Sequence, residues 1–170
     1  MFGFPLLIPQ PIEASPTPSR FGLAALAVAR HELGNGESGR DNDGPDVRRY
    51  GASPGANWCA AFVSYCLERG ALDELCRPLP IERSNAARTL WKRCGRAGAF
   101  VTHPLPGDVA CWWRVSLTDW RGHVGLVSVV KDGGHFFECA EGNKGRFPSR
   151  VREYGHELGE PRLLGFARLP

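Results

Sequence analysis

Three residues of types that can do nucleophilic chemistry stand where structural elements are expected to begin or end. Cys59 opens an apolar segment directly after a loop-forming stretch, residues 53–57. His123 begins an apolar, strand-like segment, and Glu141 ends a later one. A thiolate can attack a carbonyl carbon, an imidazole can carry the proton, and a carboxylate can orient the imidazole. The sequence therefore predicts a Cys/His/acid site.

The position of Cys59 favours the reactive form of its side chain. We expect this residue in the first turn of a helix, where unpaired backbone N–H groups and the positive end of the helix dipole stabilise a thiolate. Trp58 and the loop before it favour an exposed thiol. The alternative is a buried helix-start thiol that resembles Cys66, one heptad further along the chain.

His123 also has a structural alternative, because a histidine in an apolar strand is often a core residue with satisfied hydrogen bonds. Gly122 and Gly125 flank its position, and glycine in a strand lets other backbone or a substrate approach closely. This spacing favours a functional histidine. Groove lining and core packing explain the nearby tryptophans equally well, namely Trp112, Trp113 and Trp120.

The elements that must position these residues change in type along the chain. Apolar residues recur at helical spacing before residue 101, and short strands separated by Gly, Pro and Asp follow it. The predicted helices are residues 19–33, 46–50, 58–70 and 84–94, and the predicted strands are residues 109–113, 123–130, 135–140 and 163–169. Ser19 is the expected cap of the first helix, and Gly34 and Gly95 are the expected stops of the first and last. The order predicts an α+β fold, with N-terminal helices packed on a small antiparallel sheet.

The composition is that of one globular domain. The chain has 170 residues, of which 42% are hydrophobic and 23% charged, so it can build a real core. The net charge of +3 is mild and its Lys and Arg are scattered, so nucleic acid is not an expected partner. Prolines make residues 1–18 a predicted flexible arm before a single domain, residues 19–170. The arm lacks the features of a secretory signal or a membrane span.

The remaining cysteines and acidic residues do not predict a cofactor. The six cysteines show no CxxC pair, and the histidines and cysteines do not cluster at zinc-binding spacings. Buried, reduced thiols are expected at Cys66, Cys76, Cys94, Cys111 and Cys139. Asp41, Asp43 and Asp46 form an acidic loop, but the loop lacks the full EF-hand spacing and its closing glutamate. Calcium is therefore the weaker alternative to no metal.

Four motifs follow one another along the chain, namely Trp-Cys-Ala-Ala-Phe-Val-Ser at 58–64, Pro-Gly-Asp-Val-Ala at 106–110, Gly-His-Val-Gly-Leu-Val at 122–127 and Glu-Gly-Asn at 141–143. In this order they resemble the CHAP family of cysteine, histidine-dependent amidohydrolases and peptidases. The resemblance runs from about residue 21 to about residue 168 and includes the segment 42–50. It implies a papain-like fold, and typical members of the family cut amide bonds in bacterial peptidoglycan.

The resemblance also implies a role for each site residue. Cys59 would attack the amide carbon, and His123 would take its proton and later protonate the leaving amine. Glu141 would accept from the second imidazole nitrogen, with Asn143 and Glu138 as alternatives. The backbone N–H of Cys59 is the expected first donor to the oxyanion. Asn143 or a residue just before Cys59 would be the second, and the sequence does not assign it.

The expected function is hydrolysis of an amide bond in peptidoglycan, by an N-acetylmuramoyl-L-alanine amidase or a peptide endopeptidase. One alternative is a papain-like amidase or transferase with a substrate outside the wall. Another is a non-catalytic wall-binding module, against which the intact Cys, His and Glu argue. Because the sequence shows no Sec signal, we expect cytoplasmic synthesis and delivery to the wall by a phage or a secretion system. An injected enzyme would have a cognate inhibitor protein as a partner.

Overall fold

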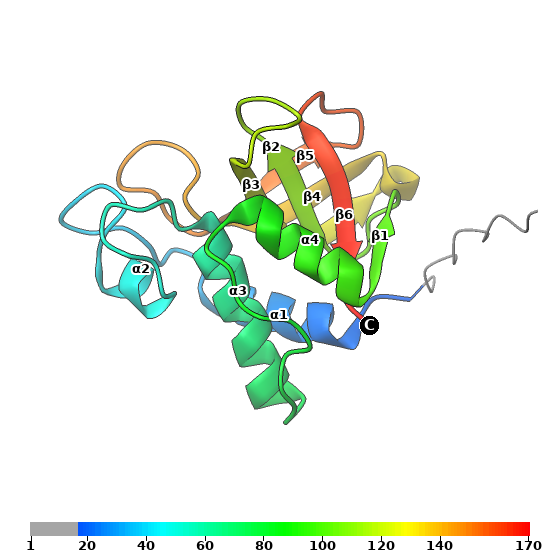
Figure 1. The fold of residues 1–170 in the computed structure, drawn as a ribbon, viewed down its shortest axis with the longest axis horizontal. Helices are drawn as coiled ribbons and strands as arrows, with labels where there is room; N and C mark the ends of the chain where they lie inside the picture. The colour runs from blue at the N-terminus through cyan, green and yellow to red at the C-terminus, as the bar shows by residue number, and fades with distance from the viewer. Residues whose placement is uncertain (1–16) are drawn as a thin grey trace, which may run out of the picture.

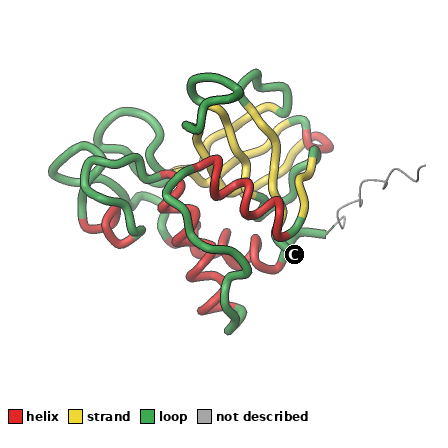
Figure 2. Tube along the Cα trace, in the orientation of Figure 1, coloured by secondary structure: helices red, strands yellow, loops and turns green. Residues whose placement is uncertain are grey.

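The fold is built on one antiparallel sheet, against which the helices pack. The computed structural model describes residues 17–170, and in that range the sheet has six strands in the order β1-β6-β2-β3-β4-β5. The strands are β1 (Ala99–Val101), β2 (Val109–Trp113), β3 (Gly122–Lys131), β4 (Phe136–Glu141), β5 (Arg152–Glu157) and β6 (Leu163–Arg168). β2 and β3 are central, β1 and β5 are the edges, and the whole sheet is twisted (Figure 2).

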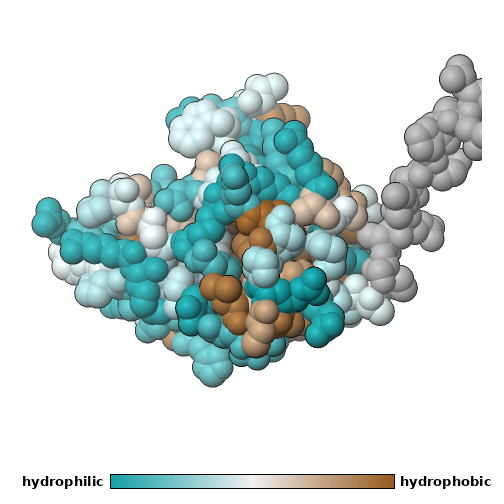
Figure 3. Space-filling model, turned by 60° about the horizontal axis from the view of Figure 1, so that its bottom comes forward, coloured by the Kyte–Doolittle hydropathy of each residue, from teal (hydrophilic) through white to brown (hydrophobic). Residues whose placement is uncertain are grey.

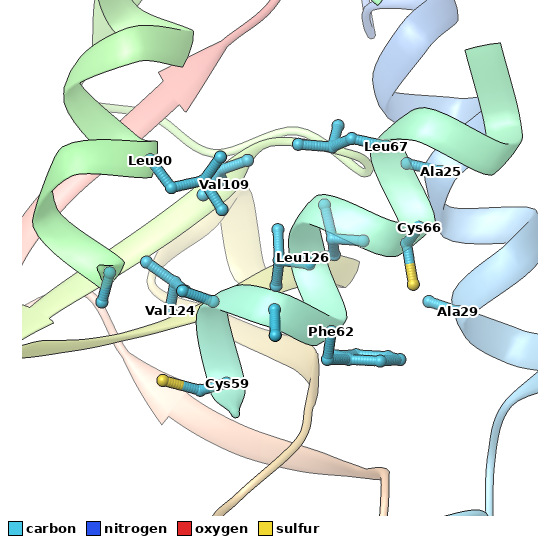
Figure 4. Packing of buried hydrophobic residues seen from close by; sticks show 14 of the residues in the cluster. Ala25, Ala29, Cys59, Phe62, Cys66, Leu67, Leu90, Val109, Val124 and Leu126 are labelled. Atoms are coloured by element: carbon cyan, nitrogen blue, oxygen red, sulfur yellow. The ribbon is translucent and has the colours of Figure 1, made fainter. Parts of the chain in front are cut away.

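The helices lie mainly on one face of this sheet (Figure 1). They are α1 (Arg20–His31), α2 (Pro45–Arg49), α3 (Cys59–Arg69) and α4 (Ala87–Ala97). α3 lies between α1 and α4, while α2 sits apart among long loops (Figures 1 and 4). Ser19 caps α1 as predicted, since its hydroxyl accepts the backbone N–H of Gly22 over 3.2 Å. Helices packed on an antiparallel sheet confirm the α+β class.

Two helix ends differ from the prediction. α4 continues through Gly95 to Ala97, because this glycine makes room for a ring and does not stop the helix. A Cβ at Gly95 would lie 2.3 Å from Cε1 of Phe100. α3 is followed by an unpredicted π-helical turn, Gly70–Glu74. Cys76, predicted to be buried, is instead exposed just beyond that turn and has a φ of 51°.

The sequence does not predict β1 and β5, the two edge strands. β1 has three residues, too few to show a period of two. β5 reads Arg-Glu-Tyr-Gly-His-Glu and lacks alternating apolar residues. Charged side chains are common on edge strands, where one side of the strand meets water. Strand prediction from apolar alternation therefore finds central strands and overlooks these edges.

The sheet has a separate apolar cluster on each face. The cluster that faces the helices includes Phe62, Val124 and Leu126 (Figure 4). The smaller cluster on the other face contains Ala110, Trp112, Val127, Phe137, Cys139 and Phe166. Successive side chains of a strand point to opposite faces. His123 therefore shares the face of Val127, while its neighbour Val124 faces α3.

One face of the described surface, shown in Figure 3, is mostly hydrophilic. On the face shown in Figure 3, apolar residues reach the surface in small groups bordered by hydrophilic ones. Among residues 17–170, no helix has the length and apolar character needed to span a membrane. The first sixteen residues of the predicted arm lie outside the described residues.

Candidate active site

Cys59 lies in the first turn of α3, as predicted, but the residue is only 5% exposed. The prediction of an exposed thiol is therefore wrong. Trp58 is completely buried, so the start of α3, which directly follows it, also lies inside the protein. Cys59 lies on a cleft of about 330 Å³ that is also lined by Asn57, Arg114 and Trp120. A backbone N–H at the first position of a helix has no acceptor within the helix, so that of Cys59 is available to a ligand.

Trp58 connects the start of α3 to the end of β4. Its indole N–H donates to the buried carboxylate of Glu37 over 2.9 Å, and the other oxygen of Glu37 accepts the backbone N–H of Ser149 over 2.7 Å. The indole ring packs on Gly142, where a Cβ would lie 2.2 Å from ring atom Cζ3. Because Gly142 directly follows Glu141, this contact fixes α3 relative to the end of β4.

His123, the second residue of β3, bridges Cys59 and Glu141. Its Nε2 is 2.5 Å from Oε2 of Glu141, and its Nδ1 is 3.0 Å from Nη2 of Arg114. The side chain of Cys59 also lies close enough to interact with the imidazole. Because Glu141 engages Nε2, Nδ1 is the ring nitrogen that remains for the thiol. The structure thus brings together Cys59, His123 and Glu141 from α3, β3 and β4.

Two glycines of β3 provide the close approach that the sequence suggested. A Cβ at Gly125 would lie 2.6 Å from Cγ of Glu141. This glycine therefore leaves room for the Glu141 side chain to pass over β3 toward His123 on the same face of the sheet. A Cβ at Gly122 would lie 2.9 Å from Cγ of Arg88. The Arg88 guanidinium donates to backbone carbonyls of the loop between β2 and β3, which forms one wall of the cleft.

The thiol of Cys59 behaves differently from the other buried thiols. Burial raises the pKa of the thiols of Cys66, Cys94, Cys111 and Cys139. Burial acts on Cys59 in the same direction, but the hydrogen bond and charge of His123, with the N–H of Val124, hold its pKa below the ordinary value. Burial likewise lowers the pKa of His123, but Cys59 and Glu141 outweigh this effect and raise it. The pair therefore favours a thiolate and an imidazolium.

Glu141 is completely buried, and both of its oxygens have donors. Oε2 faces His123, while Oε1 accepts from Nζ of Lys144 over 3.0 Å and lies 2.6 Å from Nε2 of His156. Burial raises the pKa of this carboxyl, but the bonds to both histidines and the charge of Lys144 lower it to about 2. An ionised Glu141 can accept the Nε2–H of His123 and so hold its ring with Nδ1 toward Cys59.

The two alternatives to Glu141 lie elsewhere. Glu138 forms its ion pair with a lysine at the other end of β3. Asn143 has no contact with His123 among the described hydrogen bonds, and its Nδ2 donates to Oδ1 of Asn57 over 3.1 Å. With a φ of 57°, Asn143 also makes the turn after β4, a conformation that Asn tolerates.

His156 and Glu160 belong to this network, and sequence reasoning missed both. His156 lies on β5, and its Nδ1 is 2.8 Å from Oε1 of Glu160. The available signal was a histidine and a glutamate four residues apart. Without β5 in the prediction, nothing placed that pair near Glu141.

Arginines pair with two of the three carboxylates in the acidic segment that leads into α2. Asp43 pairs with Arg48 at 2.8 Å, and Asp46 pairs with Arg49 at 3.2 Å. Within residues 17–170, no group of three or more His, Cys, Asp and Glu side chains could hold a metal ion. The two carboxylates are thus already engaged by cations of the chain.

Gly142→Ala should displace Trp58, and with it Cys59, because a methyl group does not fit beside the indole. Overpacking of this kind costs about 1–3 kcal/mol in the free energy of unfolding. Urea denaturation measures that cost, and a slower reaction of Cys59 with iodoacetamide would report the displacement. Gly159→Ala is the matched control, since a Cβ there meets nothing within 4 Å. Equal stability and equal reactivity of the two variants would show that the indole contact does not constrain the site.

The lowered pKa of Cys59 predicts alkylation at pH values where an ordinary thiol, with a pKa of about 8.5, is protonated. The thiolate is lost as pH falls through the lowered pKa of Cys59, and the imidazolium is lost as pH rises through the raised pKa of His123. Iodoacetamide labelling followed by mass spectrometry, in a Cys76→Ser background, measures the profile. Glu141→Gln should move the inflection upward, because it removes a charge that supports the imidazolium. A wild-type inflection at the ordinary thiol pKa would contradict the ion pair.

Comparison with known proteins agrees with this geometry. A family model described as a CHAP domain matches residues 50–143, which is more than half of the chain. No curated protein matches the chain. The matched span contains Cys59, His123 and Glu141, whereas His156 and Glu160 lie beyond it. The chain therefore belongs to the CHAP family, whose members are amidohydrolases and peptidases that typically act on peptidoglycan.

Proposed function

We propose that this protein is a cysteine-dependent peptidoglycan hydrolase that cleaves an amide bond through Cys59, His123 and Glu141. One observation carries the proposal, namely the series of three neighbouring groups in which the imidazole of His123 interacts with the Cys59 side chain and has its Nε2 2.5 Å from Oε2 of Glu141. Three different elements assemble it inside the span that matches the CHAP family. The bond would be the N-acetylmuramoyl-L-alanine amide or a peptide bond of the stem or cross-bridge.

The reaction would proceed in two halves. The thiolate of Cys59 attacks the amide carbonyl carbon, and the carbonyl electron pair moves to oxygen. As the oxyanion collapses, the C–N bond breaks and Nδ1 of His123 gives its proton to the leaving amine, which leaves a thioester on Cys59. Water then attacks the thioester while His123 accepts its proton. The C–S bond breaks, the carboxylic acid product leaves, and the thiolate–imidazolium pair returns.

Glu141 keeps the imidazole in the orientation that both halves need. Its pKa of about 2 keeps it ionised, so it accepts the Nε2–H of His123 throughout the cycle. The other ring nitrogen then remains directed at Cys59 and at the substrate. The negative charge also stabilises the imidazolium, in the manner of the acid in a Ser-His-Asp triad.

Asn57 is the second oxyanion donor in this proposal, beside the backbone N–H of Cys59. It lines the same cleft as Cys59 and precedes it by two residues. Its Oδ1 accepts from Asn143, which leaves the Nδ2 group of Asn57 free to donate to a developing oxyanion. Asn143 would then act by orienting Asn57. The two candidates that the sequence left open for the second donor, Asn143 and a residue just before Cys59, would thus both contribute to the oxyanion site.

The walls of the cleft suit a polymer of sugars and acidic peptides. Trp120 is 71% exposed and offers a flat apolar face to a sugar or peptide group. Arg114 has no carboxylate partner among the described residues, and its guanidinium lies beside His123. A guanidinium pairs well with carboxylates, which the stem peptides of peptidoglycan carry. The leaving fragment could be held there.

Digestion of purified peptidoglycan should depend on Cys59. Mass spectrometry of the products from wild type and from Cys59→Ala identifies the bond and assigns the nucleophile together. Free stem peptides indicate an amidase, and shortened or uncrosslinked muropeptides indicate an endopeptidase. We expect Cys59→Ala to lose at least about 10³-fold in rate, because no other described group can form the thioester. An unchanged wall, with Cys59 still readily alkylated, would favour a substrate outside the wall.

Directed export tests the proposed place of action. We propose that the protein is made in the cytoplasm and meets the wall after delivery by a phage or a secretion system. Fused to an export signal, the wild type should lyse a bacterial host from the periplasm, while Cys59→Ala should not. Rescue by a protein encoded beside it would identify the cognate inhibitor. Abundant folded protein in the periplasm without lysis would contradict this route.

A further inference from the structure

Both oxygens of the Glu141 carboxylate have hydrogen-bond partners, and His123 is the partner of only one of them. With a donor at a single oxygen, a carboxylate could still rotate about its terminal bond. The second oxygen, Oε1, lies 2.6 Å from Nε2 of His156 and accepts from Lys144. Because Glu141 is fully buried, water does not compete for this oxygen. The donors at Oε1 therefore decide how the carboxylate presents Oε2 to His123.

His156 is itself fixed on every side. Its side chain is 7% exposed and lies against the rings of Trp112 and Phe137, with ring centroids 4.5 Å and 5.4 Å away. Nδ1 is 2.8 Å from Oε1 of Glu160, and the other oxygen of Glu160 accepts the indole N–H of Trp112 over 2.8 Å. A ring held by packing and by both nitrogens is a rigid donor, in contrast to a flexible surface side chain.

Both nitrogens of His156 face carboxylate oxygens, and ionised carboxylates only accept hydrogen bonds. The bonds to Glu141 and Glu160 therefore exist together only when both nitrogens carry a proton. The other charged group in contact is Lys144, whose Nζ lies 3.2 Å from Nε2 and shares Oε1 as acceptor. Glu160 thus holds the Nδ1 side of the ring, while Glu141 and Lys144 lie on its Nε2 side.

Lys144 alone does not explain the placement of Glu141. Its side chain is 31% exposed, and its ammonium also lies over the ring of Tyr154, 4.2 Å from the centroid. A lysine on a turn loses more side-chain entropy on ordering than an imidazole already held between two aromatic rings. His156 is therefore the better-ordered donor at Oε1.

We propose that His156, held by Glu160, is a positioning residue that fixes the Glu141 carboxylate for His123, so that the site extends from Cys59 to the edge strand β5. This inference rests on the proposed role of Glu141. It adds two residues beyond the span that matches the CHAP family. His156 does not touch the substrate in this scheme and acts through Glu141.

The test uses His156→Phe, which keeps an aromatic ring between Trp112 and Phe137 but removes both donors. On peptidoglycan, we expect kcat to fall about tenfold to a hundredfold, the range for misplacement of a catalytic group. KM should stay within about twofold, since no substrate contact is lost. His156→Gln can still donate to Oε1 and should restore part of kcat. Glu157→Gln, an exposed change on the same strand, is the matched control.

A spectroscopic readout separates positioning from a merely structural role. In wild type, the Nε2–H of His123 should give a low-field proton resonance, because it donates to a buried carboxylate. His156→Phe should shift or broaden that resonance while circular dichroism stays unchanged. If the Phe variant does not fold, His156→Gln and Glu160→Gln carry the same measurements, each with a partial loss of kcat expected.

The outcomes distinguish this inference from the proposed function. A wild type with neither wall hydrolysis nor enhanced Cys59 alkylation would remove the proposed function. A reactive wild type, whose His156 and Glu160 variants fold and keep both kcat and the His123 resonance, would overturn the positioning role and leave Cys59, His123 and Glu141 in place.

Discussion

The burial of one carboxylate governs the architecture of this protein. A charge without access to water is costly unless donors surround it, and breaking such a set leaves an uncompensated charge inside the protein. Glu141 meets this condition with two imidazoles and an ammonium. The two imidazoles come from β3 and β5, the strands on either side of β4, which carries Glu141. The absence of a side chain at Gly125 leaves room for the Glu141 carboxylate between them.

Packing, and not an N-cap hydrogen bond, holds the helix start that carries the nucleophile. The residue before α3 makes no side-chain cap hydrogen bond, and the helix start is anchored by the indole of Trp58. This anchor rests on the same turn that follows Glu141. Nucleophile and acid are thus fixed to a common support, and the imidazole of His123 lies between them. The same burial that would keep an isolated thiol protonated serves here to strengthen an ion pair.

The sequence predicted the parts of the fold that have strong apolar periodicity. The start of α3 and the four central or long strands follow from such patterns. The candidates Cys59, His123 and Glu141 follow from their chemistry, their places at the ends of these elements and the resemblance to the CHAP family. Long-range geometry was not predictable in the same way. The burial of Cys59 follows from Trp58 and Glu37, which are 21 residues apart, and only the tertiary structure brings them together. His156 stands in a strand with too few apolar residues to be recognised. The sequence favoured Glu141 over Glu138, and in the structure it is the Glu141 end of β4 that approaches His123.

The edge strand β5 also affects whether the sheet can pair with strands of other molecules. Its outer residues include the exposed, charged side chains of Arg152, Glu153 and Glu157, while His156 turns inward. An uncovered strand edge can accept a strand from another molecule, and charges along it discourage such pairing. The opposite edge, β1, is only three residues long. Within residues 17–170, the two edges of the sheet therefore offer little template for pairing with a strand of another molecule.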